Sequence, residues 1–306
     1  MGTQALRLGV VGFGVGGMRF HAPYVQAAEG VQLAGIVTRD PARVQLAAER
    51  HPGVPVFASL TDMIRSGAVD AVTITTPPQT RRALVLEALA AGLHVIADKP
   101  FAPDAAAARE LVDAARVAGR QLGVFHNRRW DDNMRALQPV LASGALGTVR
   151  RFHSWFDLDE PSTVEAGPTG GLLRDLGSHL VDQALWLFGP VNRVFARLDW
   201  MDTPDGRTDV GFVLTLEHRS GVDSHLGASK LNRAAERGLR VYGERRSHCV
   251  SHPDAPGDYT PYYEAFARAV REGGPLPVPG VDAVRVLEVL DAARESDVGH
   301  RVVALG

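Results

Sequence analysis

The most constraining feature of this chain is the regular alternation of short apolar runs and helical segments over its first 125 residues. Apolar or β-branched runs typical of strands occupy residues 8–11, 33–37, 54–57, 71–75, 93–97 and 122–125. Helical spacing of apolar residues occupies 17–28, 41–49, 81–91 and 105–118, and Ser59 is suited to cap a further helix. Strands separated by helices need right-handed crossovers, which produce a parallel sheet covered on both faces. We therefore predict an α/β domain with a parallel, doubly wound sheet over residues 1–125.

The pattern changes after Trp130. Strand-like runs occur at residues 149–156, 194–200, 210–216, 222–228 and 239–242, and helical periodicity at 134–141, 171–188, 261–271 and 281–294. Short turn-forming loops such as Pro204-Asp205-Gly206 join the later strands, with no helix between them. Because consecutive strands of this kind pair antiparallel, we predict an α+β C-terminal domain over residues 126–306 with an open, mainly antiparallel sheet.

A glycine cluster, Gly12-Phe13-Gly14-Val15-Gly16-Gly17, stands between the first strand and the first helix. Here Gly12 permits a tight turn, Gly14 lets a pyrophosphate approach the backbone, and Gly17 lets the helix pack closely on the strand. Free N–H groups and the helix dipole at Gly16 and Gly17 favour negative charge. The cluster predicts a dinucleotide-binding Rossmann domain, and a glycine-rich turn without a ligand is the alternative.

The residues after the second strand indicate which dinucleotide binds. NAD-binding domains usually carry Asp or Glu at this point to accept from the ribose 2′-hydroxyl, whereas this chain has Thr38-Arg39-Asp40. A hydroxyl and a guanidinium suit a 2′-phosphate, which a carboxylate at the first position would repel. NADP is therefore the predicted cofactor. NAD stays an alternative, because Asp40 can either cap the next helix or reach the ribose.

Lys99, Asp175 and His179 form the predicted catalytic group. Lys99, in Asp98-Lys99-Pro100, stands where the apolar run 93–97 ends, and the carboxyl ends of parallel strands open into the ligand crevice. Asp175 and His179 are four residues apart, so on a helix they share one face. His179 suits proton transfer near neutral pH, and Lys99 suits stabilisation of a developing alkoxide. Taken singly, Asp175 could be a helix N-terminal acid and His179 a packed helix histidine.

These motifs together resemble the Gfo/Idh/MocA family of glucose–fructose oxidoreductases and inositol dehydrogenases. The similarity to its subgroup of NADP-dependent scyllo-inositol dehydrogenases is carried by residues 12–23, 98–101, 124–131 and 175–185, and it covers nearly the whole chain. The resemblance implies hydride transfer between NAD(P) and a sugar, polyol or related carbonyl compound. Lys99 would lie at the nicotinamide, with Asp175 as the acid and His179 as the proton-transfer residue.

The resemblance also implies that the second domain binds substrate and forms homodimers or homotetramers through its open sheet. Such an interface would cover apolar residues of that sheet that are partly exposed in a single copy, such as Val194, Val213 and Leu226.

Further candidates border the predicted cofactor site. Arg128 or Arg129 suits either substrate oxygens or an interdomain ion pair, and Trp130 suits a pocket wall or interdomain packing. The predicted cofactor-binding residues are Gly12, Phe13, Gly14, Val15, Gly16, Gly17, Thr38, Arg39, Thr76, Pro77, Asp98, Lys99 and Asn127. The predicted substrate-binding residues are Lys99, Arg128, Trp130, Asp175 and His179.

Several segments depart from the family pattern. Pro78 and Arg81 stand where the family commonly has an asparagine and a histidine, and Pro78 has no amide with which to bind ribose. Residues 157–163 replace an expected tryptophan–arginine segment, and residues 242–262 are abbreviated. The substrate is therefore left open, and a catalytically silent nucleotide-binding regulator is the alternative to an enzyme. The presence of the catalytic group favours the enzyme.

The composition of the chain argues against several classes of function. A formal net charge of -2 over 306 residues gives no basic surface for nucleic acid or an anionic membrane. No apolar stretch approaches the ~20 residues of a membrane helix and no apolar signal region is present, so we expect a cytoplasmic protein. Cys249, the only cysteine, excludes an intramolecular disulfide and a thiolate cluster. Asp175, His179 and His153 lack a recognisable ligand spacing, so no metal is predicted.

Overall fold

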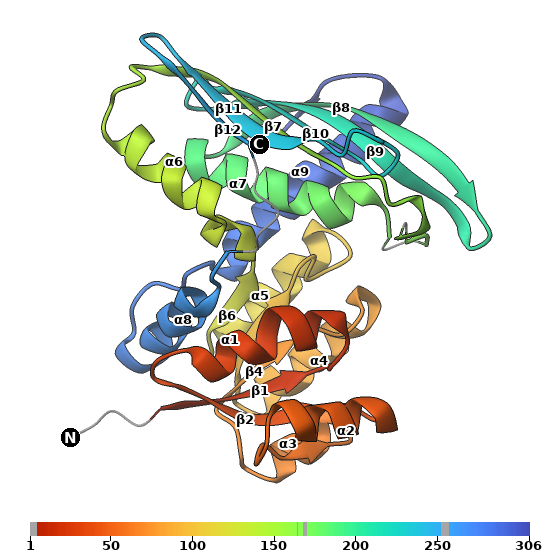
Figure 1. Cartoon of the computed structure of the whole chain (residues 1–306), viewed down its shortest axis with the longest axis vertical. Helices are drawn as coiled ribbons and strands as arrows, with labels where there is room; N and C mark the ends of the chain where they lie inside the picture. Colours follow the sequence, from red (N-terminus) through yellow and green to blue (C-terminus); the bar gives the residue numbers. More distant parts are fainter. Residues whose placement is uncertain (1–4, 164, 168–169, 252–256) are drawn as a thin grey trace. The chain divides into compact units, whose positions relative to one another are not determined.

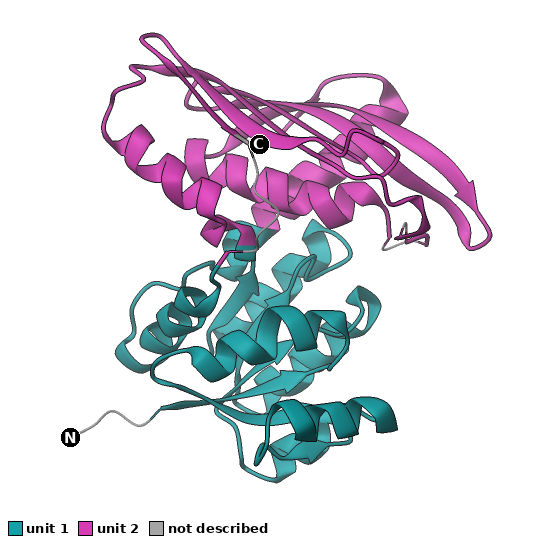
Figure 2. Cartoon of the chain, viewed as in Figure 1, with its two compact units in different colours: residues 1–127, 258–283 teal, residues 128–257, 284–306 magenta. Residues whose placement is uncertain are grey.

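The computed structural model describes residues 5–163, 165–167, 170–251 and 257–306, and the chain divides into two compact units (Figure 2). The first comprises Met1–Asn127 and Asp258–Ala283, and the second comprises Arg128–Gly257 and Val284–Gly306. Helix α8 (Thr260–Glu272), which the sequence pattern assigns to the C-terminal domain, thus lies in the first unit. Its Tyr262 hydroxyl donates to the carbonyl of Val124 at 3.0 Å.

A six-stranded parallel sheet forms the first unit's core (Figure 1). Its strands are β1 (Leu6–Val11), β2 (Val31–Val37), β3 (Val56–Phe57), β4 (Ala71–Ile74), β5 (His94–Asp98) and β6 (Leu122–Phe125). They lie in the order β3-β2-β1-β4-β5-β6, and every neighbouring pair is parallel. The order reverses between β1 and β4, the point at which doubly wound sheets bind ligands. The prediction of a parallel, doubly wound sheet is confirmed.

Helices connect the strands of this sheet. They are the π-helical segment Gly17–His21, α1 (Ala22–Ala27), α2 (Pro41–Arg50), α3 (Leu60–Arg65), α4 (Pro78–Ala90) and α5 (Ala105–Ala118). Side-chain oxygens of Asp40, Ser59 and Asp104 cap α2, α3 and α5 by accepting a first-turn backbone N–H. The segment 17–28, predicted as one helix, instead begins with a π-helical turn.

The second unit is built on a seven-stranded mixed sheet. Its strands are β7 (Val149–Asp157), β8 (Val191–Thr203), β9 (Gly206–His218), β10 (Asp223–Ser229), β11 (Arg237–Gly243), β12 (Ser247–Ser251) and β13 (Val303–Ala304). They lie in the order β12-β11-β7-β10-β9-β8-β13, and all pairs are antiparallel except β7 with β10. The mainly antiparallel sheet is confirmed. The sequence reading missed β12 and β13, which are short edge strands without a clear alternation.

Helices α6 (Asp132–Ala142), α7 (Ser178–Phe188) and α9 (Gly280–Gly299) lie along one face of this second sheet (Figure 1). Val194 and Leu226 are 0% and 1% exposed, so both are buried, whereas Val213 is 62% exposed. The expectation that all three would be partly exposed is wrong for Val194 and Leu226. Successive residues of a strand face opposite sides of the sheet, and Val213 precedes Leu214, the residue paired with Leu226.

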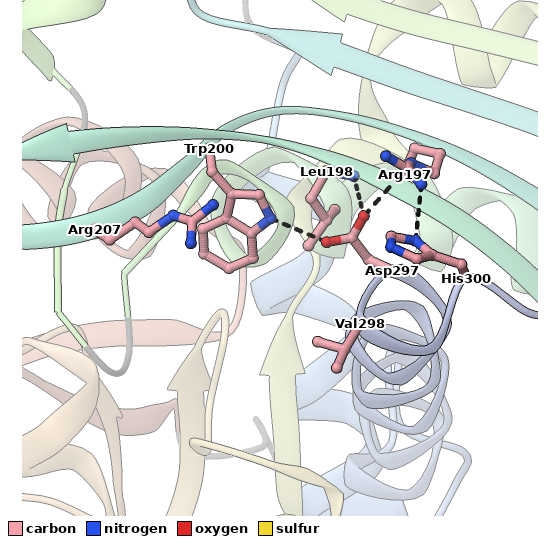
Figure 3. Close-up of a pocket in the computed structure, with 7 residues that line it drawn as sticks. All are labelled: Arg197, Leu198, Trp200, Arg207, Asp297, Val298 and His300. Atoms are coloured by element: carbon pink, nitrogen blue, oxygen red, sulfur yellow. Dashed lines mark hydrogen bonds and ion pairs between the residues drawn. The ribbon is translucent and has the colours of Figure 1, made fainter.

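The last turns of α9 cover the edge of β8 (Figure 3). The carboxylate of Asp297 accepts from the Leu198 backbone N–H at 2.9 Å and from Trp200 Nε1 at 3.0 Å. Ser296 Oγ accepts from the Ala196 N–H at 2.9 Å. These bonds satisfy edge groups that would otherwise be free to pair with another strand. A cavity of about 490 Å³ opens beside this contact, and no predicted site residue lines it.

No helix among the described residues is long and apolar enough to cross a membrane.

Candidate active site

The glycine cluster forms the turn between β1 and the π-helical segment Gly17–His21. Gly12 has φ +102°, which favours glycine, and a Cβ there would lie 3.0 Å from Thr76 Cγ2. A Cβ on Gly17 would lie 2.1 Å from the Gly12 carbonyl oxygen, so the segment packs directly on the turn. Among described residues, a Cβ on Gly14 would come within 4 Å only of Arg43 Nη1, at 3.9 Å. The backbone at Gly14 is therefore open to a ligand.

This turn fits the pyrophosphate of a dinucleotide. Val15 is 62% exposed beside Gly14, and both precede a helical segment whose amide groups and dipole favour an anion. Side chains at Gly14 or Gly16 would occupy this space or collide with its wall, since a Cβ on Gly16 would lie 2.4 Å from Thr75 Oγ1. The Phe13 ring is 1% exposed, so Phe13 has only its backbone to offer the cofactor.

Two arginines follow β2, Arg39 directly after the strand and Arg43 in the first turn of α2. Thr38 is buried and its N–H donates to the Phe57 carbonyl at 3.0 Å, while Arg39 is exposed. Asp40 caps α2, accepting from the Arg43 N–H at 3.0 Å, which is one of the two roles predicted for it. Arg43, which the sequence reading missed, brings a second guanidinium to the glycine turn. The available signal was its place three residues after the cap Asp40, in the first turn of the helix that follows β2.

Asp98, at the end of β5, connects this strand to the glycine turn. Its Oδ2 accepts from Thr75 Oγ1 at 3.1 Å and lies 3.4 Å from His21 Nε2. Burial raises the pKa of the Asp98 carboxyl, but hydrogen bonding to His21 and the charges of His21, Arg81 and Lys99 together hold that pKa well below its usual range. Asp98 is therefore an ionised group that binds Thr75 and His21. These two contacts fix the end of β5, and with it the start of the loop that carries Lys99.

Arg81 joins the two loops that carry Thr76 and Lys99. Its Nε donates to the Thr76 carbonyl at 2.7 Å, and its Nη1 donates to the carbonyls of Asp98 and Pro100 at 3.0 and 2.5 Å. The Lys99 N–H donates to Asp98 Oδ1 at 2.8 Å. Arg81, which stands where the family commonly has a histidine, thus holds the ends of β4 and β5 in place.

Asp175 lies in a second π-helical segment, Leu173–Gly177, which runs directly into α7. The predicted helix over 171–188 accordingly changes type at Ser178. Over the described ranges, both π-helical segments carry predicted site residues, and π turns often occur at functional sites. The Asp175 side chain is 47% exposed and lies 3.8 Å from Lys230 Nζ, whereas His179 is 6% exposed.

Asp209 fixes the start of this segment. Its Oδ2 accepts from the Leu173 N–H at 2.6 Å, and its Oδ1 lies 3.6 Å from Arg294 Nη2. Burial raises the pKa of the Asp209 carboxyl, although this hydrogen bond and the Arg294 charge act against the shift. Gly171 has φ +97°, and a Cβ there would lie 2.1 Å from Asp209 Oδ1. The chain therefore enters the segment through a position that only glycine fits.

Arg128 and Arg129 both have partners inside the second unit. Arg128 Nη1 donates to Asp131 Oδ2 at 3.2 Å, and its guanidinium lies 4.5 Å from the Phe156 ring centre. Arg129 donates to both carboxylate oxygens of Asp182, at 2.9 and 2.6 Å, and both side chains are buried. Arg129 is thus a structural residue, while the partly exposed Arg128 stays a substrate-binding candidate.

The structure brings the cofactor candidates of the first unit together at the carboxyl ends of β1, β2, β4 and β5. Asn127 ends the first of that unit's two chain segments and is 9% exposed. Lys99 belongs to the first unit and Asp175 and His179 to the second, so their action on one substrate oxygen stays a prediction. In the part of the chain that the structure describes, no group of three His, Cys, Asp or Glu residues is arranged to hold a metal ion.

Comparison with known families places matches along the whole chain. Residues 6–126 match the oxidoreductase family with an NAD-binding Rossmann fold, residues 134–248 match the GFO/IDH/MocA C-terminal domain, and residues 251–305 match the family's C-terminal alpha/beta domain.

Individual relatives align over nearly their full length. The uncharacterised oxidoreductase YdgJ of Escherichia coli is 30% identical over 96% of this chain and 97% of its own. The NADP⁺-dependent scyllo-inositol 2-dehydrogenase IolW of Bacillus subtilis is 26% identical over 99% and 97%. The solved structure of YPO2259 from Yersinia pestis superposes with a TM-score of 0.87 at 30% identity, covering 99% and 98%.

Proposed function

Since the chain belongs to the Gfo/Idh/MocA oxidoreductase family, whose first domain is an NAD-binding Rossmann fold, we propose that it is an NADP-preferring dehydrogenase or reductase of sugars or polyols. The observation that carries the proposal lies in the first unit. Asp98, next to Lys99, contacts Thr75 after β4 and His21 in the segment that follows the glycine turn, and its Oδ2 lies 3.4 Å from the Cβ position of Gly16, so the lysine and the predicted pyrophosphate site share one edge of the sheet. That edge is where such sheets bind ligands.

In this proposal each member of the catalytic group has its own task. The bound nicotinamide supplies the hydride acceptor or donor. His179 removes the hydroxyl proton during oxidation and returns it during reduction, and Lys99 stabilises the negative charge that develops on the same oxygen. Asp175 orients the substrate or the histidine. Burial of His179 keeps water from competing for the proton, while the half-exposed carboxylate of Asp175 is accessible to a substrate hydroxyl.

The preference for NADP rests on Thr38, Arg39 and Arg43. No carboxylate stands at the first position after β2, and Asp40 is engaged as the cap of α2. The two guanidinium groups are the chemistry that binds a 2′-phosphate through charge-assisted hydrogen bonds.

The polyol substrate class is proposed from two sources. IolW, by name a scyllo-inositol 2-dehydrogenase, aligns over 99% of this chain. Asp175 and Arg128 are a partly exposed acceptor and donor of the kind that hydroxyl groups need. The replaced segment 157–163 argues against assuming inositol itself.

The test has two stages. Fluorescence titration with NADPH and NADH establishes the cofactor, and a panel of inositols, sugars and their oxidised forms then identifies a substrate. Lys99→Ala should lower turnover about 10²-fold or more while NADPH affinity stays near that of the unmodified protein, because the lysine acts on the reacting oxygen. His179→Ala should lower the rate near neutral pH and flatten the pH profile. Unchanged turnover in either variant would overturn the catalytic role of that residue, whereas NADPH binding with no turnover of any compound in the panel would favour the silent nucleotide-binding alternative.

A further inference from the structure

Lysine is almost absent from this chain. Of its 33 lysine and arginine residues, only Lys99 and Lys230 are lysines. Arginine serves every other basic position, including the exposed ion pairs, where the two side chains are nearly equivalent. Lysine differs in being a compact point charge with three donors, whereas arginine carries a broad planar fork. Because arginine stands at every other basic position, we infer that the two lysines stand where a compact cation is needed. One of them is the proposed catalytic lysine.

The other, Lys230, is held in a fixed place by its own backbone. It directly follows β10, and its N–H donates to the Val210 carbonyl of β9 at 2.9 Å. Its carbonyl accepts from the Glu160 N–H at 3.1 Å. Because both backbone groups are bonded to neighbouring segments, the direction in which the side chain leaves the sheet is set by the fold.

The Lys230 side chain ends beside the carboxylate of Asp175. Its Nζ lies 3.8 Å from Asp175 Oδ2 and donates to the Thr163 carbonyl at 2.7 Å. The pair is unequal in exposure, since the lysine side chain is 9% exposed and the aspartate side chain 47%. Lys230 thus lies behind the carboxylate, and Asp175 presents its open side to solvent or substrate.

A buried ammonium group is costly unless it is paired. Lys230 is paired with a carbonyl dipole and with the one acid that the proposed reaction uses. Arg129–Asp182 buries both partners and Arg193–Glu217 exposes both, whereas Arg197–Asp297 and Arg294–Asp209 bury the acid and leave the arginine more exposed. In Lys230–Asp175 the order is reversed, with a buried cation behind a half-exposed acid, which is the arrangement expected where a carboxylate is aimed at a ligand.

We propose that Lys230 is a positioning residue of the active site, which holds the carboxylate of Asp175 oriented for a substrate hydroxyl. The proposal rests on the proposed function, because it needs Asp175 to meet the substrate. Through the Thr163 carbonyl, Lys230 also connects Asp175 to the segment 157–163, which departs from the family pattern. The Lys230 ammonium group then contacts both the Asp175 carboxylate and the loop beside it.

The kinetic test is a double-mutant cycle with Lys230→Gln, Asp175→Asn and the double variant. Glutamine keeps an N–H donor for the Thr163 carbonyl and removes only the charge. We expect Lys230→Gln to lower kcat about 10-fold with KM for NADPH unchanged, and to have no further effect once Asp175 is Asn. The control is Arg82→Met, which removes an exposed ion pair with Glu110 in the first unit and should leave kcat unchanged.

The other outcomes are distinguishable. Full turnover in Lys230→Gln, with Asp175→Asn impaired, overturns the role of Lys230 and leaves the proposed function standing. Losses that simply add in the double variant also overturn it, because Lys230 would then act elsewhere. Full turnover in Asp175→Asn removes the role proposed for the acid itself, and the role of Lys230 falls with it.

A second measurement needs no substrate. Protein labelled with ¹³C at lysine Cε should show two lysine resonances, assigned by the one that disappears in Lys230→Gln. Asp175→Asn should move the Lys230 resonance, because Lys230 Nζ lies 3.8 Å from that carboxylate. An unmoved Lys230 resonance would overturn the pairing on which the proposal stands.

Discussion

Arg39, which precedes α2, and Arg43, in its first turn, are the two residues that we propose to decide cofactor choice. Arg43 Nη1 reaches to within 3.9 Å of the Cβ position of Gly14, and Asp40 between them is occupied as a helix cap. A 2′-phosphate on the adenosine ribose would bring two negative charges into this region. Two exposed guanidinium groups stabilise such a ligand and offer NADH much less.

We expect Arg39→Ala and Arg43→Ala each to weaken NADPH binding about 10-fold or more, with the affinity for NADH changed far less. Fluorescence titration with both cofactors measures the ratio. Arg50→Ala, at the other end of α2, is the matched control and should alter neither affinity. Equal losses for NADPH and NADH would mean that neither arginine recognises the phosphate.

The carboxylate of Asp98 joins several elements of the first unit. It joins the end of β5 to Thr75 after β4 and to His21 in the first π-helical segment. His21 continues the connection to α8, since its Nδ1 lies 2.6 Å from the Tyr263 hydroxyl. These elements are distant in sequence, so the carboxylate holds the cofactor edge of the sheet together.

Replacing Asp98 with Asn should lower the free energy of unfolding near pH 7 by about 1–3 kcal/mol, since charge-assisted hydrogen bonds are lost. The pKa of the folded Asp98 is depressed, so its contribution is present above the unfolded carboxyl pKa near 3.8 and is lost as pH falls below it. Urea unfolding at pH 7, 5 and 3 should therefore show a constant deficit that shrinks only at the lowest pH. Asp113→Asn, an exposed acid on α5, is the control.

At the scale of the molecule, the second sheet has a face that the helices of its unit leave uncovered. On the face of the second sheet opposite α6, α7 and α9, Val213 is 62% and Phe195 38% exposed, and the Trp155 ring stacks with Arg240 at 5.2 Å. An exposed sheet face of this kind is suited to a second copy of the chain, which agrees with the predicted homodimer or homotetramer.

If copies associate through this face, Val213→Glu should shift the protein toward the monomer, because a charge would be buried in the interface. Sedimentation velocity at micromolar concentration measures the state. Val298→Glu, at a 79% exposed position near the end of α9, should not change it. A monomeric unmodified protein under these conditions would contradict the prediction.

Much of the fold was predictable because local patterns decide it. The six parallel strands, the caps at Asp40 and Ser59 and the turn at Gly12 all follow from periodicity and side-chain chemistry over a few residues. The family matches confirm the predicted resemblance and the NAD(P)-dependent oxidoreductase class. The individual site residues stay predictions, although the motifs that carry them could be read directly from the chain.

The sequence alone determined the parallel, doubly wound sheet, the glycine turn and the residues of the candidate catalytic group, since each depends on short-range spacing. Only the tertiary structure decided the partners: Arg81 with two loops, Asp98 with His21, and Lys230 with Asp175. It also decided that β7 pairs parallel with β10 and that two helices begin as π turns. Such contacts join residues many positions apart, and their stability comes from burial and charge pairing that no local pattern contains.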